Sequence, residues 1–136
     1  MSIRTTESMT ERENLVCRHI EKAFRTTIIR TGYLDDFDFY GVRDGRTVGV
    51  GEIKCRNNPH NEYPTVYLSV HKWSRLLEVS RALNVRGIFV ANWTDQTRWI
   101  YVAQINASAH TIAGRYDRKD APNDLEPMIL VPTDEM

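Results

Sequence analysis

Residues 38–54 of the chain read Asp38-Phe-Tyr-Gly-Val-Arg-Asp-Gly-Arg-Thr-Val-Gly-Val-Gly-Glu-Ile-Lys54. The pattern predicts a β-hairpin, because two runs rich in strand-forming residues flank a polar turn at residues 43–46. Side chains two apart in a strand share a face, so Glu52 and Lys54 point one way and Ile53 points the other. The hairpin therefore places a carboxylate and an ammonium side by side at the end of an apolar stripe.

The two acids of this hairpin need partners. Asp38 lies at its start and Glu52 near its end, both in runs otherwise rich in apolar residues. Burying a carboxylate without a partner is costly, and a bound divalent cation would satisfy both acids. Mg²⁺ favours one or two carboxylates together with water and a substrate phosphate. The alternative is a surface hairpin on which Glu52 and Lys54 form a solvated pair that contributes little stability.

The spacing of these residues also resembles a known motif: Asp38 is followed by thirteen residues and then by Glu52-Ile53-Lys54. This arrangement is similar to the active-site signature of the PD-(D/E)xK nucleases, in particular their Holliday-junction-resolvase-like and small phage-type members, although the leading Pro is absent. The resemblance implies that Asp38, Glu52 and the Ile53 carbonyl bind Mg²⁺ or Mn²⁺. It also implies that Lys54 orients the attacking water and that products carry 5′-phosphate and 3′-hydroxyl ends.

The composition restricts the class of protein. With 136 residues, 41% of them apolar, the chain is long enough for one globular domain. We expect a single nuclease-like domain over residues 1–136, with a core at about 10–105 and a C-terminal extension at 106–136. No stretch approaches the roughly 20 apolar residues of a membrane span, and the N-terminus lacks the apolar region of a signal peptide. Cys17 and Cys55 suit a reducing cytoplasm, with a disulfide between them left open.

The first predicted helix covers Thr10 to Phe24, with Thr10 as N-cap in a capping box completed by Glu13. Glu13 lies at the N-terminal end of the apolar stripe, so it is either a capping residue or a contributor to the site. Resolvase-like nucleases often contribute a metal-binding acid from a helix that opens with a Glu-Arg-Glu-like string, and residues 11–13 resemble that string. The periodicity favours Glu13 over Glu11 as the further metal ligand.

The second helix opens within Tyr67 to Trp73, with Ser69 as its N-cap. Lys72 falls in the first turn, where a cation is mildly unfavourable against the helix dipole. It is either an ordinary exposed lysine or a catalytic residue. Many PD-(D/E)xK enzymes carry a Lys or Gln on this helix, so the resemblance implies the catalytic role.

Three further side chains, together with Lys72, are candidates for contacting the phosphate backbone. Arg56 and His60 lie in the polar loop at residues 56–64, which is long enough to cover the active-site end of the sheet, and His71 precedes Lys72. Phosphate contacts of this kind position a nucleic acid without reading its sequence. The alternative is that this loop is an ordinary solvated connection.

The remaining pattern predicts an α/β fold. Residues 26–31 form either a short strand or the frayed end of the first helix, residues 87–93 form a buried strand, and residues 98–105 form an antiparallel edge strand. A helix between two strands predicts a crossover with a parallel pair. The order matches the restriction-endonuclease-like αβββαβ core, a central mixed sheet flanked by helices.

Outside this core the sequence predicts less. Asp35 and Asp36 are assigned to the loop before the hairpin, with Asp36 as the reserve acid if the register differs by two. Residues 110–116 predict a short element, residues 117–127 a surface loop, and residues 128–132 an edge strand.

These features predict a metal-dependent nuclease, most simply an endonuclease that acts on DNA, branched DNA included. The alternatives are an RNA-processing nuclease and a non-catalytic nucleic-acid-binding module of the same fold, against which the intact Asp38, Glu52 and Lys54 argue. The formal charge of zero argues against non-specific coating of nucleic acid but is compatible with a local basic rim. The partner is nucleic acid rather than a membrane, and a resolvase would require a symmetric homodimer.

Overall fold

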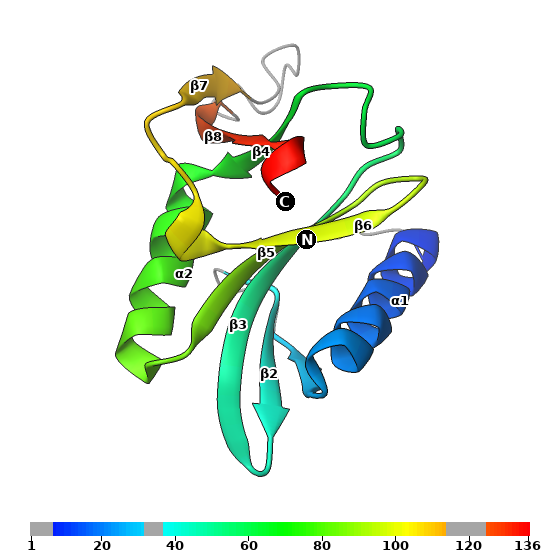
Figure 1. Ribbon diagram of the computed structural model, residues 1–136, viewed down its shortest axis with the longest axis vertical. Helices are drawn as coiled ribbons and strands as arrows, with labels where there is room; N and C mark the ends of the chain where they lie inside the picture. The colour runs from blue at the N-terminus through cyan, green and yellow to red at the C-terminus, as the bar shows by residue number, and fades with distance from the viewer. Residues whose placement is uncertain (1–6, 32–36, 114–124) are drawn as a thin grey trace.

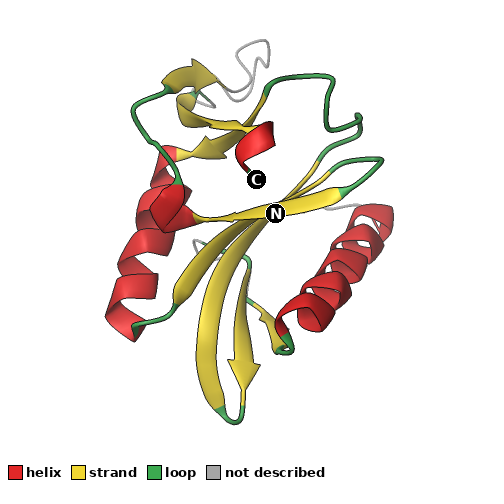
Figure 2. Ribbon diagram, in the orientation of Figure 1, coloured by secondary structure: helices red, strands yellow, loops and turns green. Residues whose placement is uncertain are grey.

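A computed structural model describes residues 7–31, 37–113 and 125–136 of the chain. The helices and strands follow one another in the predicted order, with an additional strand before the second helix (Figures 1 and 2). Their bounds are α1 Glu7–Phe24, β1 Thr27–Arg30, β2 Phe39–Arg43, β3 Arg46–Cys55, β4 Thr65–Ser69, α2 Val70–Leu83, β5 Arg86–Asn92, β6 Thr97–Tyr101, η1 Val102–Gln104, β7 His110–Ala113, β8 Glu126–Pro132 and η2 Thr133–Glu135.

The central sheet has five strands in the order β1-β2-β3-β5-β6. Strands β3 and β5 run parallel, and the other neighbours are antiparallel, so the predicted mixed sheet, parallel pair and edge position of β6 are confirmed. The residues after α1 form β1, not a frayed helix end. Arg25 adopts a left-handed conformation with φ of 53°, which ends the helix and turns the chain into the strand.

The hairpin β2–β3 forms as predicted, with Arg43 opposite Arg46 across the turn. Asp44 and Gly45 both have positive φ, 53° and 73°, as a two-residue turn of the primed type requires. This turn matches the right-handed twist of the two strands and fixes their register. Asp38 precedes β2 and Glu52 lies in β3, so the register brings the two acids to the same end of the hairpin.

Helix α1 packs on one face of the sheet and α2 on the other (Figure 1). Val16, Cys17 and Ile20 of α1 contact a core that includes Ile53 of β3. The helix begins at Glu7 rather than at Thr10, so the predicted N-cap at Thr10 is wrong. No Pro or Gly lies between residues 7 and 10 to stop the helix from extending by one turn.

Helix α2 has the predicted N-cap, since the Ser69 hydroxyl accepts a hydrogen bond from the Lys72 backbone N–H at 3.4 Å. Asn84 ends the helix in a left-handed conformation with φ of 56°. Leu76 and Ser80 of this helix are buried, whereas Leu83, in its last turn, is exposed. Residues 65–69 form a strand, β4, that was not predicted. The predicted start of the second helix, at residues 67–73, overlaps this short strand.

A second sheet, in the order β4-β8-β7, covers the α2 side of the molecule (Figure 1). Strand β8 is the middle strand of this sheet, so its prediction as an edge strand is wrong: β4 and β7 pair with its two edges. Ile129 and Val131 of β8 are fully buried against Val50 and Phe89 of the central sheet. The predicted element at residues 110–116 is present as β7, whereas residues 117–124 of the predicted loop lie outside the described residues.

None of the helices in the described part of the chain is long and apolar enough to cross a membrane. Cys17 and Cys55 are both free thiols, so the disulfide that the sequence left open is not formed between them. Burial raises the pKa of both thiols, so neither is activated as a nucleophile.

Gly51 provides a test of the hairpin packing, because a Cβ at this position would lie 2.3 Å from Cζ of the buried Phe39 ring. We expect Gly51→Ala to lower the free energy of unfolding by roughly 1–3 kcal/mol, since the buried ring must shift to accommodate the added methyl group. Urea unfolding measures the change. At Gly49 the nearest atom to an added Cβ is the Arg86 carbonyl oxygen at 3.4 Å, so Gly49→Ala is the control. An equal loss in both variants would contradict the packing described.

Candidate active site

Glu52 is a carboxylate buried within the central sheet. Val50, two residues earlier, belongs to the core on the α2 side, whereas Ile53 belongs to the core on the α1 side, so Glu52 faces α2. The residue is only 3% exposed. Its Oε2 accepts a hydrogen bond from Lys72 Nζ at 2.7 Å, and its Oε1 is buried without a hydrogen-bond partner in the described part of the chain. One oxygen of a buried acid is therefore left for a ligand.

Asp38 is held by backbone hydrogen bonds on both sides. Its N–H donates to the Gly51 carbonyl at 2.9 Å, and its own carbonyl accepts from Thr31 N–H at 2.9 Å. Its carboxylate Oδ2 accepts from the Ile53 N–H at 2.8 Å. Asp38, which precedes β2, is thereby fixed against the β3 backbone at Ile53, between Glu52 and Lys54.

The electrostatics of Glu52 reflect this arrangement. Burial raises the pKa of its carboxyl to about 7, and the negative charge of Asp38 acts in the same direction. The charges of Lys72 and Lys54, together with the hydrogen bond from Lys72, oppose the rise without cancelling it. The charge of Asp38 thus acts on Glu52, and the shared role of the two acids in binding a metal stays a prediction.

The two lysines of the site have different environments. Burial lowers the pKa of the Lys54 ammonium, and the positive charges of Arg56 and Lys72 lower it further. Burial alone would also lower the pKa of Lys72, but the charge and hydrogen bond of Glu52 outweigh it and raise that pKa. Lys72 is thus an ion-pair partner of Glu52, whereas Lys54 is a cation held in a poorly solvated, positively charged environment.

Two residues that the sequence analysis did not single out lie around the site. Arg12 of α1 donates hydrogen bonds to the Asn92 side chain, to Asn57 Oδ1 at 2.8 Å and to the Arg56 carbonyl, and so holds the loop after β3. The charge of Glu126, at the start of β8, acts on both lysines: it opposes the lowering of the Lys54 pKa by burial and adds to the rise of the Lys72 pKa that Glu52 causes. Sequence proximity could not reveal either contact, because the partners lie more than forty residues apart.

The structure does not bring Glu13 to the two acids. Its carboxylate forms an ion pair with Arg30 at 2.7 Å, and Glu11 is exposed on the same helix. Across the described residues, no group of three His, Cys, Asp or Glu side chains is placed to hold a metal ion. The geometry therefore does not support Glu13 as a metal ligand, because its carboxylate is paired with the Arg30 guanidinium of β1. Asp36, the reserve acid, lies outside the described residues.

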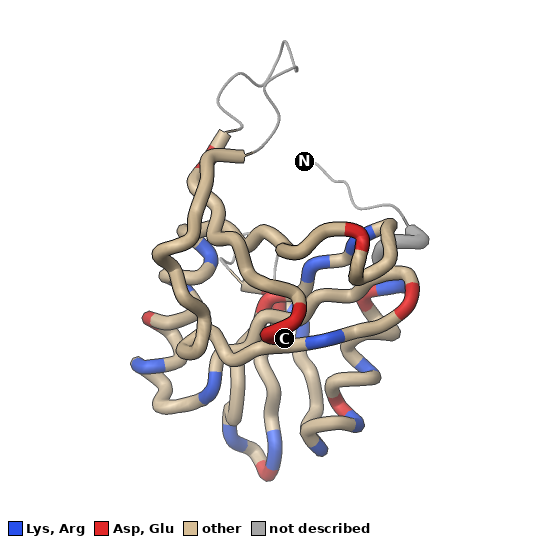
Figure 3. The backbone as a smooth tube through the Cα atoms, turned by 45° about the horizontal axis from the view of Figure 1, so that its top comes forward, with Lys and Arg blue, Asp and Glu red and all other residues tan. Residues whose placement is uncertain are grey.

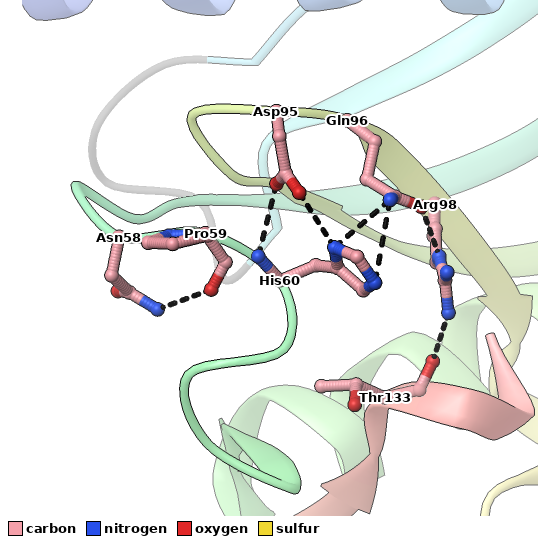
Figure 4. A network of polar contacts seen from close by, with 7 residues as sticks. All are labelled: Asn58, Pro59, His60, Asp95, Gln96, Arg98 and Thr133. Carbon is pink, nitrogen blue, oxygen red and sulfur yellow. Dashed lines mark hydrogen bonds and ion pairs between the residues drawn. The ribbon is translucent and has the colours of Figure 1, made fainter.

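His60 contacts the neighbouring loop between β5 and β6 (Figure 4). Its N–H donates to Asp95 Oδ1 at 2.9 Å, its ring Nδ1 lies 2.7 Å from Asp95 Oδ2, and the Gln96 amide nitrogen lies 2.9 Å from the same ring atom. This geometry does not support the predicted phosphate contact of His60. Arg56 follows Lys54 on the same face, and His71 is exposed in the first turn of α2 beside Lys72.

The residues present fit a divalent cation. A hard cation with carboxylate ligands requires one or two acids and accepts further oxygen ligands. Glu52 Oε1 is buried without a partner, and the Asp38 carboxylate lies near it. The carbonyl of Ile53 as a third ligand stays a prediction; the N–H of the same residue donates to the Asp38 carboxylate.

Comparison with known proteins gives the chain a family. A family model described as "Phage putative PDDEXK endonuclease" matches residues 3–136. No curated protein matches the chain. Among solved structures, Hjc of Archaeoglobus fulgidus, a Holliday junction resolvase from an archaeal hyperthermophile, is similar with a TM-score of 0.57 and 17% identity, covering 71% of this chain and 75% of that chain.

The structural likeness confirms the fold, because the sheet and helices follow the restriction-endonuclease-like arrangement predicted from the sequence. The family model extends over nearly the whole chain, including Asp38, Glu52 and Lys54. The protein therefore belongs to this phage family of PD-(D/E)xK endonucleases.

Proposed function

We propose that Asp38, Glu52, Lys54 and Lys72 form the active site of a Mg²⁺- or Mn²⁺-dependent endonuclease that cleaves DNA. One observation carries the proposal: a buried carboxylate oxygen of Glu52 lacks a hydrogen-bond partner in the described structure beside a second acid. A protein that only bound nucleic acid would gain nothing from the cost of burying this acid. The same cost argues against the non-catalytic module considered from the sequence.

In this proposal Asp38 and Glu52 hold the divalent cation, with the Ile53 carbonyl as a further ligand. When bound, the cation lowers the pKa of a water molecule and neutralises charge on the phosphate. Lys54 donates a hydrogen bond to the attacking water and stabilises the negative charge of the transition state. Lys72 keeps Glu52 in position through its 2.7 Å ion pair and faces the phosphate with the exposed part of its side chain.

DNA is the substrate that the relatives favour over RNA. The structural neighbour is a Holliday junction resolvase, which makes branched DNA the first substrate to test and a symmetric homodimer the assembly to look for. Lys and Arg residues are interspersed with Asp and Glu over several elements (Figure 3). A chain of this kind binds a polyanion through a local site rather than through its overall charge. We place the protein as one domain in the cytoplasm, where its free thiols stay reduced.

Removing the Lys54 ammonium tests the chemistry. We expect Lys54→Ala to lower the cleavage rate at least about a hundredfold, because electrostatic stabilisation of the transition state is lost. The rate is measured on branched and duplex DNA with Mg²⁺ or Mn²⁺, with EDTA as the blank. Lys22→Ala, at an exposed lysine of α1, should cleave like the wild type. Normal cleavage by a folded Lys54→Ala variant would refute the assignment.

The raised pKa of Glu52 predicts a pH-dependent stability in EDTA. The folded carboxyl holds its proton up to about pH 7, whereas the unfolded one releases it near its usual 4.5. The contribution to stability is therefore complete below pH 4.5 and is lost as pH rises through 7. Its size is on the order of 3 kcal/mol. Urea unfolding measures the stability of the wild type and of Glu52→Gln over this pH range. The two proteins should differ in stability above pH 7 and become similar at low pH, because Gln does not ionise.

The exposed acid Glu78 on α2 provides the control for this measurement. Glu78→Gln should keep the pH dependence of the wild type. If Glu52→Gln keeps it as well, another group causes the dependence and the buried carboxylate is wrongly described.

Metal and DNA should bind with positive coupling. Without a cation, the Asp38 and Glu52 carboxylates weaken the attraction of the nearby lysines for a phosphate, and a bound dication offsets their negative charge. We expect the wild type to bind DNA at least about tenfold more tightly in Ca²⁺ than in EDTA at one fixed salt concentration. Glu52→Gln should lose most of this difference. Equal wild-type affinities in Ca²⁺ and in EDTA would mean that the metal does not lie at the phosphate contact, and would refute the mechanism.

A further inference from the structure

A cavity of about 420 Å³ opens beside the proposed active site. We call it the aromatic pocket; its walls include Arg56, Asn58, Tyr63, Pro64, Tyr67 and Trp93. Arg56 connects it to the site, because it follows Lys54 by two residues and its charge acts on that ammonium. The volume lies in the range of pockets that bind small organic groups, about 300–1,000 Å³.

The walls of the aromatic pocket have an unusual composition. Among the large apolar side chains that the described part of the chain exposes, two are aromatic, Tyr63 at 57% and Tyr67 at 37%, and both line this cavity. Trp93 contributes a buried ring to the same cavity. Tyr67 alternates along β4 with the buried Val66 and Leu68, so the strand itself keeps the Tyr67 side chain exposed.

The rim of the aromatic pocket is held in place by hydrogen bonds from three segments. The Arg56 N–H donates to the Asn92 carbonyl at 2.8 Å, and Thr94 N–H donates to the Asn58 carbonyl at 3.1 Å. On the other side, the Thr133 N–H donates to the Pro64 carbonyl at 3.0 Å. The contacts of His60 with Asp95 and Gln96 add to these (Figure 4). The loop therefore forms the pocket before any ligand binds.

We propose that the aromatic pocket binds an unpaired nucleobase of the substrate, so that the preferred substrate carries an unpaired nucleotide near the cleaved bond. This inference rests on the proposed function. Aromatic rings bind single bases by stacking, whatever the sequence, and an arginine guanidinium adds a cation that stacks or contacts phosphate. A base inside a duplex reaches such a pocket only after it is unstacked, which costs a few kcal/mol, whereas an unpaired base pays little. The pocket therefore selects for DNA that is bulged or frayed, or whose branch point carries an unpaired base.

The test compares two DNA duplexes that differ in one nucleotide. Each carries 2-aminopurine, in one case unpaired and in the other paired with thymine, and binding to the full chain is measured in Ca²⁺. We expect wild type to bind the unpaired probe about tenfold more tightly or better, with a change in 2-aminopurine emission as the base stacks. Tyr63→Ala and Tyr67→Ala should bring the affinity ratio close to one, and Tyr67→Phe should preserve it.

Leu15→Ala is the matched control, since Leu15 is an exposed apolar residue of α1 that does not line the pocket. It should keep the wild-type ratio, and thermal unfolding of each variant checks that the fold is intact. The proposal is overturned if wild type binds both probes equally, or if the Tyr63→Ala, Tyr67→Ala double variant keeps the preference.

The cleavage assay separates this proposal from the proposed function. If cleavage depends on Lys54 but wild type binds the unpaired and paired probes with equal affinity, the proposed role of the pocket is refuted and the nuclease function is not. A preference that depends on the tyrosines in a protein that cleaves no DNA would refute the nuclease function and leave the pocket in place.

Discussion

The burial of one carboxylate, Glu52, governs the arrangement of the residues around it. An ionised acid inside a sheet loses its hydration, and the neighbouring charge of Asp38 makes ionisation still less favourable, so that its pKa rises to about 7. The protein offsets part of this cost with the ion pair to Lys72 at 2.7 Å. Replacing such a pair by apolar residues often costs no stability. Its presence here is therefore better explained by chemistry than by folding.

Several distant parts of the chain place the partners of Glu52. The Ser69 cap fixes the first turn of α2, and that turn directs Lys72 toward β3. The strand just before the cap pairs with β8, which brings Glu126 close enough to act on the lysines. The second sheet thus does more than cover the core: it determines where α2 begins and adds a negative charge at the edge of the site.

Local patterns allowed much of this to be predicted. The turn at residues 43–46, the alternation that separates Glu52 from Ile53 and the Ser69 cap depend on neighbours in sequence, and all three are found in the structure. The pairing of β4 with β8 and the choice of Arg30 as partner of Glu13 depend on residues far apart in the chain. A single sequence holds no signal for such contacts. Glu13 was therefore predicted to bind the metal, and its ion pair with Arg30 could not be foreseen.

The same geometry leaves one oxygen of Glu52 for a cation. Its Oε2 is occupied by Lys72 and its Oε1 has no partner in the described structure, so an incoming cation can take one oxygen without breaking the ion pair. A metal ligand must be deprotonated, and near pH 7 this carboxyl is divided between its two protonation states. Lys72 favours the ionised state, because its charge and hydrogen bond lower the pKa that burial raises. In the proposed site, Lys72 thereby favours the ionised acid that a cation requires. The role proposed for Lys54 is different: its pKa is lowered, and it forms no ion pair with Glu52 in the described part of the chain.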